Sequence, residues 1–196
     1  MKRVLKWTER LLFAAAIGML AYCGYVLVAA HVFQNREGRH IEQLIANPQA
    51  ALTSPKGLMG RMEIRRLGLS VIVEEGVSAH ALRRAAGHIP GTALPGHRGN
   101  VGIAGHRDTF FRPLKGIRHN DLVTLTTVSG EYHYRVVSTK VVGPHDVAVL
   151  DPSESEILTL VTCYPFYFVG SAPDRFIVRA DRVDGRGLTV PTRLTK

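Results

Sequence analysis

A run of 23 residues without Asp, Glu, Lys or Arg, residues 11–33, constrains this chain more than any other feature. As an α-helix it would be about 34 Å long, enough to cross a hydrocarbon core of roughly 30 Å. Basic residues dominate the segment before it, residues 1–10, in which Glu9 is the one acid. The positive-inside rule therefore predicts a cytoplasmic N-terminus and a single-pass transmembrane anchor, with the rest of the chain outside the cytoplasm.

A cleaved signal peptide is the alternative to this anchor. Val28-Ala29-Ala30 could serve as a cleavage site. The apolar run is, however, longer than the usual apolar region of a signal peptide, so the uncleaved anchor is the favoured prediction.

The charge of the chain favours an anionic neighbour. Its 196 residues include 25 Lys and Arg against 16 Asp and Glu, a formal net charge of +9. A lipid surface, cell-wall polymers or nucleic acid would suit that balance. The basic residues are scattered, and neither zinc-finger spacing nor an RNP-like aromatic motif is present, so we expect no nucleic acid. HExxH, a phosphate-binding glycine loop and an EF-hand loop are also missing, so no metal or cofactor is indicated.

The pattern after the apolar run predicts a linker and then a β-rich domain. Residues 34–59 are polar and Ala-rich, and Pro48 would interrupt the short helix possible there. The domain is expected over residues 60–196. Its predicted elements are a strand pair over 62–76 kinked at Gly68, a helix from 78 to about 87, a buried strand at 100–106, a hairpin of 121–128 and 131–142 turning at Ser129-Gly130, and strands at 156–163 and 175–183. Six to eight short strands predict an all-β barrel or sandwich.

Cys163 is the only cysteine in this β-rich region, because Cys23 lies in the apolar run. The two-residue period of a strand places Cys163 on the same face as Val161, at the point where Tyr164-Pro165 ends the strand. If strands 156–163 and 175–183 pair as antiparallel neighbours, Cys163 and Arg175 lie at the same end of the sheet. A buried, inert thiol and a catalytic nucleophile both fit these residues.

Thiol catalysis needs two further groups, an acid/base for the leaving amine and hydrogen-bond donors for the oxyanion. An arginine can supply the donors. Among nine histidines, His106 is best placed for the acid/base, because it follows a buried strand and Gly105 lets the backbone bend there. Periodicity alone does not separate His106 from His88 or His97.

Three motifs in this order resemble those of the sortases, most closely the class D group. They are Ala104-Gly105-His106, Leu160-Val161-Thr162-Cys163 and Arg175-Phe176-Ile177-Val178, and the resemblance extends over about residues 60–183. It implies an all-β fold, a closed sortase barrel of about eight strands with one or two short helices. The single N-terminal transmembrane helix also matches the layout of the family.

The resemblance implies a membrane-anchored cysteine transpeptidase that acts on a C-terminal sorting signal, LPxTG-like. Cys163 would attack the signal and form a thioester, and His106 would protonate the departing amine. Arg175 would hydrogen-bond the substrate and the developing oxyanion. An amine acceptor of the cell envelope would then release the acyl group, with His106 as base. The resemblance assigns Thr162 and Ala104 to substrate binding.

Other residues of the region receive structural interpretations. Arg83, Arg84, His88 and His97 are expected to be exposed and structural, and Asp108 and Asp121 to hydrogen-bond loops. L,D-transpeptidases and papain-like proteases are disfavoured by the sequence around Cys163 and by its strand-like setting. A non-catalytic, membrane-anchored scaffold of the same shape is the alternative function.

Overall fold

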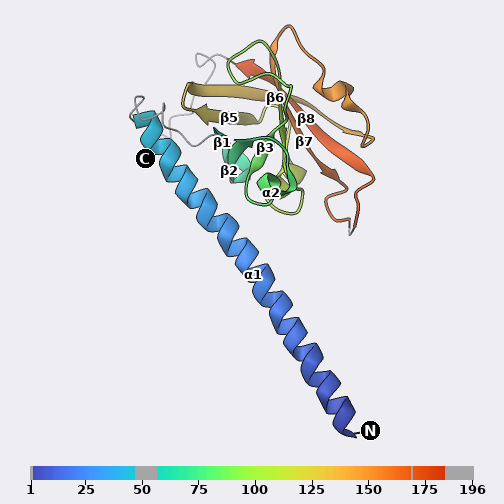
Figure 1. Cartoon of the computed structure of the whole chain (residues 1–196). Coiled ribbons are helices and arrows are strands. Elements are labelled where there is room, and N and C mark those ends of the chain that lie inside the picture. The colour runs from blue at the N-terminus through green and yellow to red at the C-terminus, as the bar shows by residue number, and fades with distance from the viewer. Residues whose placement is uncertain (1, 47–56, 169, 184–196) are drawn as a thin grey trace, which may run out of the picture.

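Eight strands form a closed barrel in the computed structural model, which describes residues 2–46, 57–168 and 170–183 (Figure 1). They are β1 (Leu58–Ile64), β2 (Leu69–Glu75), β3 (Ala86–His88), β4 (Gly99–Ala104), β5 (Leu122–Thr127), β6 (Gly130–Val142), β7 (Glu156–Tyr164) and β8 (Asp174–Val183). Around the barrel their order is β1-β2-β3-β4-β7-β8-β6-β5. Pairs β2–β3 and β4–β7 are parallel and the others antiparallel. The predicted all-β barrel is confirmed.

The interior of the barrel is filled by the inward faces of the strands. In β7, Leu158 and Leu160 are fully buried in the main core. The outer face of β7 is also covered, because the Thr159 hydroxyl donates to Asn100 Oδ1 at 2.7 Å and the Asn100 amide donates to Val149 O at 3.0 Å. Val149 belongs to the short 3-10 helix η4 (Val147–Leu150). The strand is therefore held on both faces until it reaches the rim.

Two of the predicted elements differ in extent from the structure. The helix α2 covers only Ala79–Leu82, with Ser78 as its N-cap, so the prediction of a helix to residue 87 is wrong. The last residues of the predicted helix instead form β3, which lies between β2 and β4 in the barrel and pairs with both. In the β5–β6 hairpin Thr127 pairs with Gly130, so the turn residues are Val128 and Ser129, one position earlier than predicted.

The strand pair β1–β2 turns as the sequence predicted. A 3-10 helix, η2 (Arg65–Leu67), ends at Gly68, whose φ of 61° lies in the left-handed region that glycine tolerates best. Arg66 then binds Asp121 through both carboxylate oxygens at 2.5 Å. The Arg118 N–H donates to the same carboxylate at 2.7 Å. These bonds lower the pKa of Asp121, the Arg66 contact most, and confirm that Asp121 hydrogen-bonds a loop.

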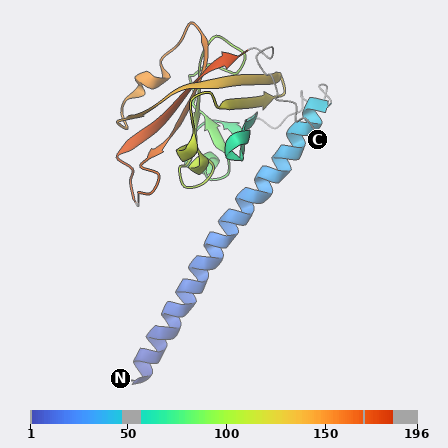
Figure 2. The same ribbon diagram turned by 180° about the vertical axis from the view of Figure 1, so that it is seen from behind.

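The N-terminal helix α1 (Lys2–Ala46) projects far from the barrel, with its N-terminus remote from every strand (Figures 1 and 2). Within it the segment Lys6–Arg39 is long and apolar enough to cross a membrane. The helix continues through residues 34–46, which the sequence assigned to a linker. Pro48 and the C-terminal stretch 184–196 lie outside the described residues.

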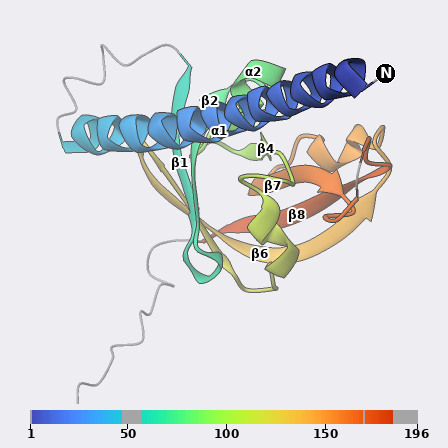
Figure 3. The ribbon, with the colours of Figure 1, turned by 90° about the horizontal axis from the view of Figure 1, so that it is seen from below.

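The C-terminal half of α1 is docked on the barrel beside β1, β2 and α2 (Figure 3). The Gln34 side chain accepts a hydrogen bond from the Ile72 N–H at 2.8 Å and donates one to Arg84 O at 2.5 Å. The Arg84 guanidinium lies 4.7 Å from the centre of the Phe33 ring. Phe33 packs with Ile72 and Ala85 in a second, smaller core cluster. The helix is therefore joined to the barrel by both polar and apolar contacts.

Candidate active site at the β4–β7–β8 rim

Cys163 and Arg175 face each other across the β7–β8 ladder. The two residues are register partners in this antiparallel pair, at the end where the chain leaves β7 and re-enters β8. Both side chains are partly buried. The Arg175 guanidinium donates to Asp174 O at 2.9 Å and to Ala172 O at 3.3 Å. The guanidinium is thus anchored to the backbone at the rim.

His106 reaches the same rim through the parallel β4–β7 pair. Ala104 pairs with Val161, and the Gly105 N–H continues the ladder by donating to Val161 O at 3.1 Å. The Thr162 hydroxyl donates to Gly105 O at 2.7 Å, so β7 holds the residue that precedes His106 from two directions. Because parallel strands end at the same edge, the residues just beyond them meet there.

Gly105 is required by space rather than by backbone bending. Its φ is not among the positive values, which are found in this chain at other glycines. A Cβ at this position would lie 2.8 Å from Cγ of Phe111, a fully buried ring of the core. The absence of a side chain therefore lets the chain pass close over Phe111 and deliver His106 to the rim.

The three residues line one cavity of about 260 Å³. Cys163 and Arg175 contribute partly buried side chains, and His106 an exposed one. The remaining wall comes from Arg107, Asp108 and the segment 170–172 of the β7–β8 connection. Such a cavity combines a thiol, an imidazole and a guanidinium, the groups that acyl transfer through a thioester needs.

Thr162 and Ala104 do not line this cavity. Thr162 is buried, and its hydroxyl donates a hydrogen bond to Gly105 O. Ala104 is the last residue of β4 and is partly buried. Their role in substrate binding stays a prediction. Among the residues that the structure describes, no three His, Cys, Asp or Glu side chains gather as a metal site would require.

The sortase domain family model matches residues 62–183, more than half of the chain, from within β1 to the last residue of β8. The chain belongs to the sortase family. Sortase D of Bacillus subtilis is 36% identical over 125 residues, which are 63% of this chain and 63% of that protein. The chain thus spans less than two thirds of that relative's length. The class D-like assignment made from the sequence is supported.

Solved sortase structures share the fold. A sortase D5 transpeptidase of Clostridium perfringens superposes with a TM-score of 0.65 at 25% identity, covering 74% of this chain and 95% of that one. Sortase A from Corynebacterium diphtheriae gives a TM-score of 0.63 at 30% identity, covering 74% of this chain and 67% of that one. The likeness therefore extends over most of this sortase.

Arg107 lines the rim cavity, and the sequence reasoning missed it. Its side chain is only 6% exposed, and it donates to three backbone carbonyls of the β7–β8 connection: Pro165 O at 2.9 Å, Phe168 O at 2.6 Å and Gly170 O at 3.0 Å. Asp108 Oδ1 lies 3.4 Å from Arg107 Nε, so Asp108 meets this arginine. The position of an arginine directly after His106 was the only available signal.

Aromatic rings pack together at the ends of the β7–β8 connection. The Tyr164 ring stacks on Phe176 with centroids 6.2 Å apart, and Phe166 packs edge-on against both at 6.0 and 5.3 Å. On the outer side, Lys115 Nζ donates to the Tyr167 hydroxyl at 2.8 Å, which lowers the pKa of Tyr167. Lys115 lies in η3 (Arg112–Gly116), in the segment that follows His106. The β7–β8 connection is thus attached at several points to the chain around His106.

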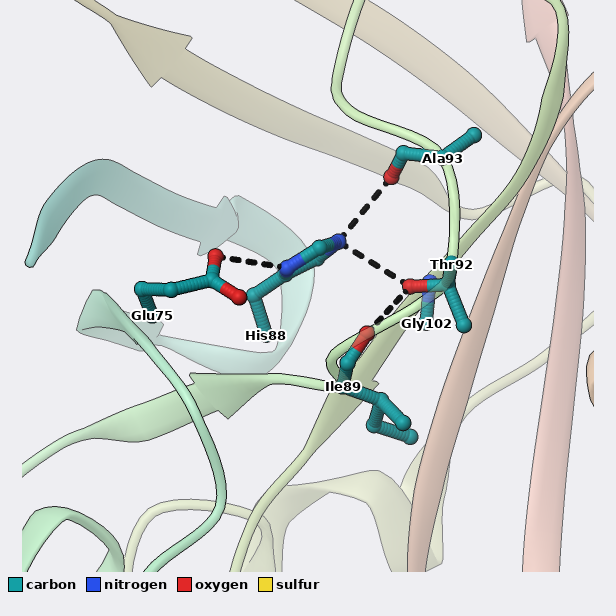
Figure 4. A network of polar contacts seen from close by, with 6 residues as sticks. All are labelled: Glu75, His88, Ile89, Thr92, Ala93 and Gly102. Carbon is teal, nitrogen blue, oxygen red and sulfur yellow. Dashed lines mark hydrogen bonds and ion pairs between the residues drawn. The ribbon is translucent and has the colours of Figure 1, made fainter.

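His88 has a structural place away from this site, and the expectation that it is exposed is wrong. Its side chain is 3% exposed. Its Nδ1 lies 2.7 Å from Glu75 Oε2, and its Nε2 lies 3.0 Å from both Ala93 O and Thr92 Oγ1 (Figure 4). The imidazole therefore joins β2 and β3 to the loop that leads into β4.

The other three residues given structural interpretations divide into two groups. Arg83 and His97 are exposed, as expected. Arg84 is partly buried, in an ion pair with Glu74 at 2.9 Å.

Proposed function

We propose that this sortase is a cysteine transpeptidase that cleaves a C-terminal sorting signal, LPxTG-like, and transfers the acyl group to an amine. The observation that carries the proposal is the single rim cavity lined by Cys163, His106 and Arg175 in a chain of this family. Similarity to a sortase D5 transpeptidase of Clostridium perfringens gives further support.

The residues divide the chemistry between them. The Cys163 thiol gives its proton to His106 as the sulfur attacks the scissile carbonyl, and the carbon–nitrogen bond breaks to leave a thioester on Cys163. His106 gives the departing amine its proton, and Arg175 donates hydrogen bonds to the oxyanion. An acceptor amine then attacks the thioester and loses its proton to His106, which passes it to the departing Cys163 sulfur and so restores the thiol. No cofactor enters this scheme.

The proposed setting is the outer side of the cell membrane. α1 would span the membrane once, with residues 1–10 in the cytoplasm, and the domain of residues 60–196 would face the envelope. Its candidate span, Lys6–Arg39, supports this placement. The protein substrate and the acceptor amine would then both be envelope components.

The test is capture of the acyl-enzyme by the full-length, detergent-solubilised protein with a library of sorting-signal peptides. Intact-mass analysis should find a covalent adduct that hydroxylamine removes, as it removes thioesters. Cys163→Ala should abolish the adduct, whereas Cys23→Ala, the matched control on α1, should keep it. An adduct that survives Cys163→Ala, or no adduct from folded wild type with any peptide, would favour the non-catalytic scaffold.

The roles of the other two residues are tested by turnover. His106→Ala and Arg175→Ala should each lower kcat/KM by roughly a hundredfold or more, because each removes a separate part of transition-state stabilisation. Two exposed residues serve as controls: His145→Ala in the β6–η4 loop and Arg179→Ala, four positions further along β8. Equal losses in the controls would show that the effect is not specific to the site.

A further inference from the structure

A second cavity, of about 610 Å³, lies between α1 and the barrel. Val26, Leu27 and Ala30 of the helix form one wall, and Ile72 and Phe110 are among the barrel residues opposite. It shares no residue with the rim cavity of Cys163. The proposed transpeptidation gives this space no role.

The contacts between α1 and the barrel make this cavity a defined feature of the fold. Gln34 is bound at both ends of its amide, to β2 and to Arg84 O. Gly38 is buried, and a Cβ there would lie 2.5 Å from Nη2 of Arg61, so the helix backbone meets the Arg61 side chain closely. The two elements therefore touch at residues 33–38, next to the cavity.

The helix wall of the cavity belongs to the candidate membrane span. Val26, Leu27 and Ala30 fall within Lys6–Arg39 and within the uncharged run of residues 11–33. They are near the C-terminal end of that run, which in the proposed orientation is the outer boundary of the hydrocarbon core. The cavity would thus begin at the depth of acyl chains and continue upward past Gln34 and Arg39.

Among the residues that the structure describes, the charged side chains of its lining are cationic. Arg39, Arg61 and Arg83 line the cavity, and no Asp or Glu is among the described residues of its wall. Arg39 is exposed, with its Nε donating to Asn35 O at 3.3 Å, and Arg83 is exposed on the barrel side. Guanidinium groups bind phosphate through paired, charge-assisted hydrogen bonds. A cavity with an apolar wall and arginines in its lining matches an amphiphile with an anionic head.

We propose that this cavity binds one anionic phospholipid, with the phosphate among the arginines and an acyl chain along Val26–Ala30 and Phe110. The inference rests on the membrane anchorage of the proposed function. Phe110 lies four residues after His106, so the lipid would contact the same segment that carries the proposed acid/base residue.

The test measures lipids retained by the full-length protein. Protein reconstituted in vesicles of equal parts phosphatidylglycerol and phosphatidylcholine is extracted gently, and native mass spectrometry counts the bound lipids. Wild type should retain phosphatidylglycerol in preference. Arg39→Gln with Arg83→Gln should lower that retention by roughly tenfold, because charge-assisted bonds to phosphate are lost. Ala30→Trp, which fills the apolar part, should do the same, and exposed Arg118→Gln should change nothing.

The outcomes separate this inference from the function on which it rests. Cys163→Ala should retain lipid like wild type, because the site needs no catalysis. The inference would be overturned by equal retention of both lipids or by unchanged retention in the arginine and Ala30 variants. It would also be overturned if the protein formed a dimer that retained no lipid. None of these results would contradict the proposed transpeptidase. Failure of the protein to stay in carbonate-washed vesicles would overturn both the anchorage and the lipid site.

Discussion

Arg107 shows how one side chain can set the shape of the rim. Its guanidinium reaches three carbonyls of the β7–β8 connection, so the segment between Cys163 and Arg175 is tied to the residue next to His106. The guanidinium spreads its donors over Nη1 and Nη2 in one plane, a geometry that the single ammonium nitrogen of a lysine cannot reproduce. Arg107 therefore affects the site by fixing the position of the backbone between β7 and β8.

Replacing Arg107 tests this positioning role. Arg107→Ala should lower kcat by roughly ten- to a hundredfold, because small misplacements of catalytic groups are costly, and Arg107→Lys should recover only part of the loss. Steady-state kinetics well below the Tm of each variant separate this effect from lost stability. Arg118→Ala is the matched control, an exposed arginine in the loop that follows η3. A kcat at the wild-type value in folded Arg107→Ala would contradict the role.

At the scale of elements, the pairing of β4 with β7 and of β7 with β8 assembles the site. Each pairing brings one residue beside Cys163: β4 leads to His106, and β8 begins with Arg175. Gly105 is the point at which this arrangement leaves no room for a side chain. The ladder and the Phe111 ring together fix the course of the chain into His106.

A single added methyl group should therefore disturb the site. Gly105→Ala puts its Cβ against the Phe111 ring, and overpacking of this kind costs about 1–3 kcal/mol in the free energy of unfolding. We expect a lower Tm and a loss of turnover. The double variant Gly105→Ala with Phe111→Leu should recover part of the turnover, since it frees space. Denaturant unfolding and kinetics of both variants provide the check, and an unaffected single variant would refute the steric argument.

The strands were predictable because their pattern is local, whereas the exceptions depend on distant partners. Alternating residues gave β5 to β8 nearly within their bounds. The sequence after Ser78 has helical character, yet Ala86–His88 form a strand because β2 and β4 provide backbone partners on either side. The burial of His88 depends in the same way on Glu75 and Ala93.

The site itself was predictable in part. The strand patterns placed Cys163 and Arg175 at one end of the sheet, and the register of β7 with β8 agrees. For His106 the family resemblance was needed, since the parallel β4–β7 pairing leaves no local signal. Arg107 was missed because its partners are carbonyls, which any sequence supplies.

At the scale of the molecule, α1 and the barrel form a joined unit. Gln34 accepts a hydrogen bond from the backbone N–H of Ile72 in β2, and the Phe33 ring lies against the Arg84 guanidinium. Gln34→Ala should speed hydrogen exchange of the Ile72 amide, because the Gln34 Oε1 acceptor is lost. Gln34→Glu keeps an acceptor oxygen and should preserve protection. Residue-resolved exchange in detergent gives the measurement, with Asn35→Ala as control. Equal exchange in Gln34→Ala and wild type would show that the docking does not persist in solution.

The unbroken helix from Lys6 to Ala46, joined to the barrel at Gln34, has a consequence for reach. A flexible linker would let an enzyme sample a wide volume. A rigid helix joined to the barrel would instead hold the active site at one height and in one orientation above the bilayer. In the proposed membrane orientation, a protein substrate would have to present its reactive bond at that height. The length of the stalk between membrane and signal in a protein substrate would decide whether it is processed.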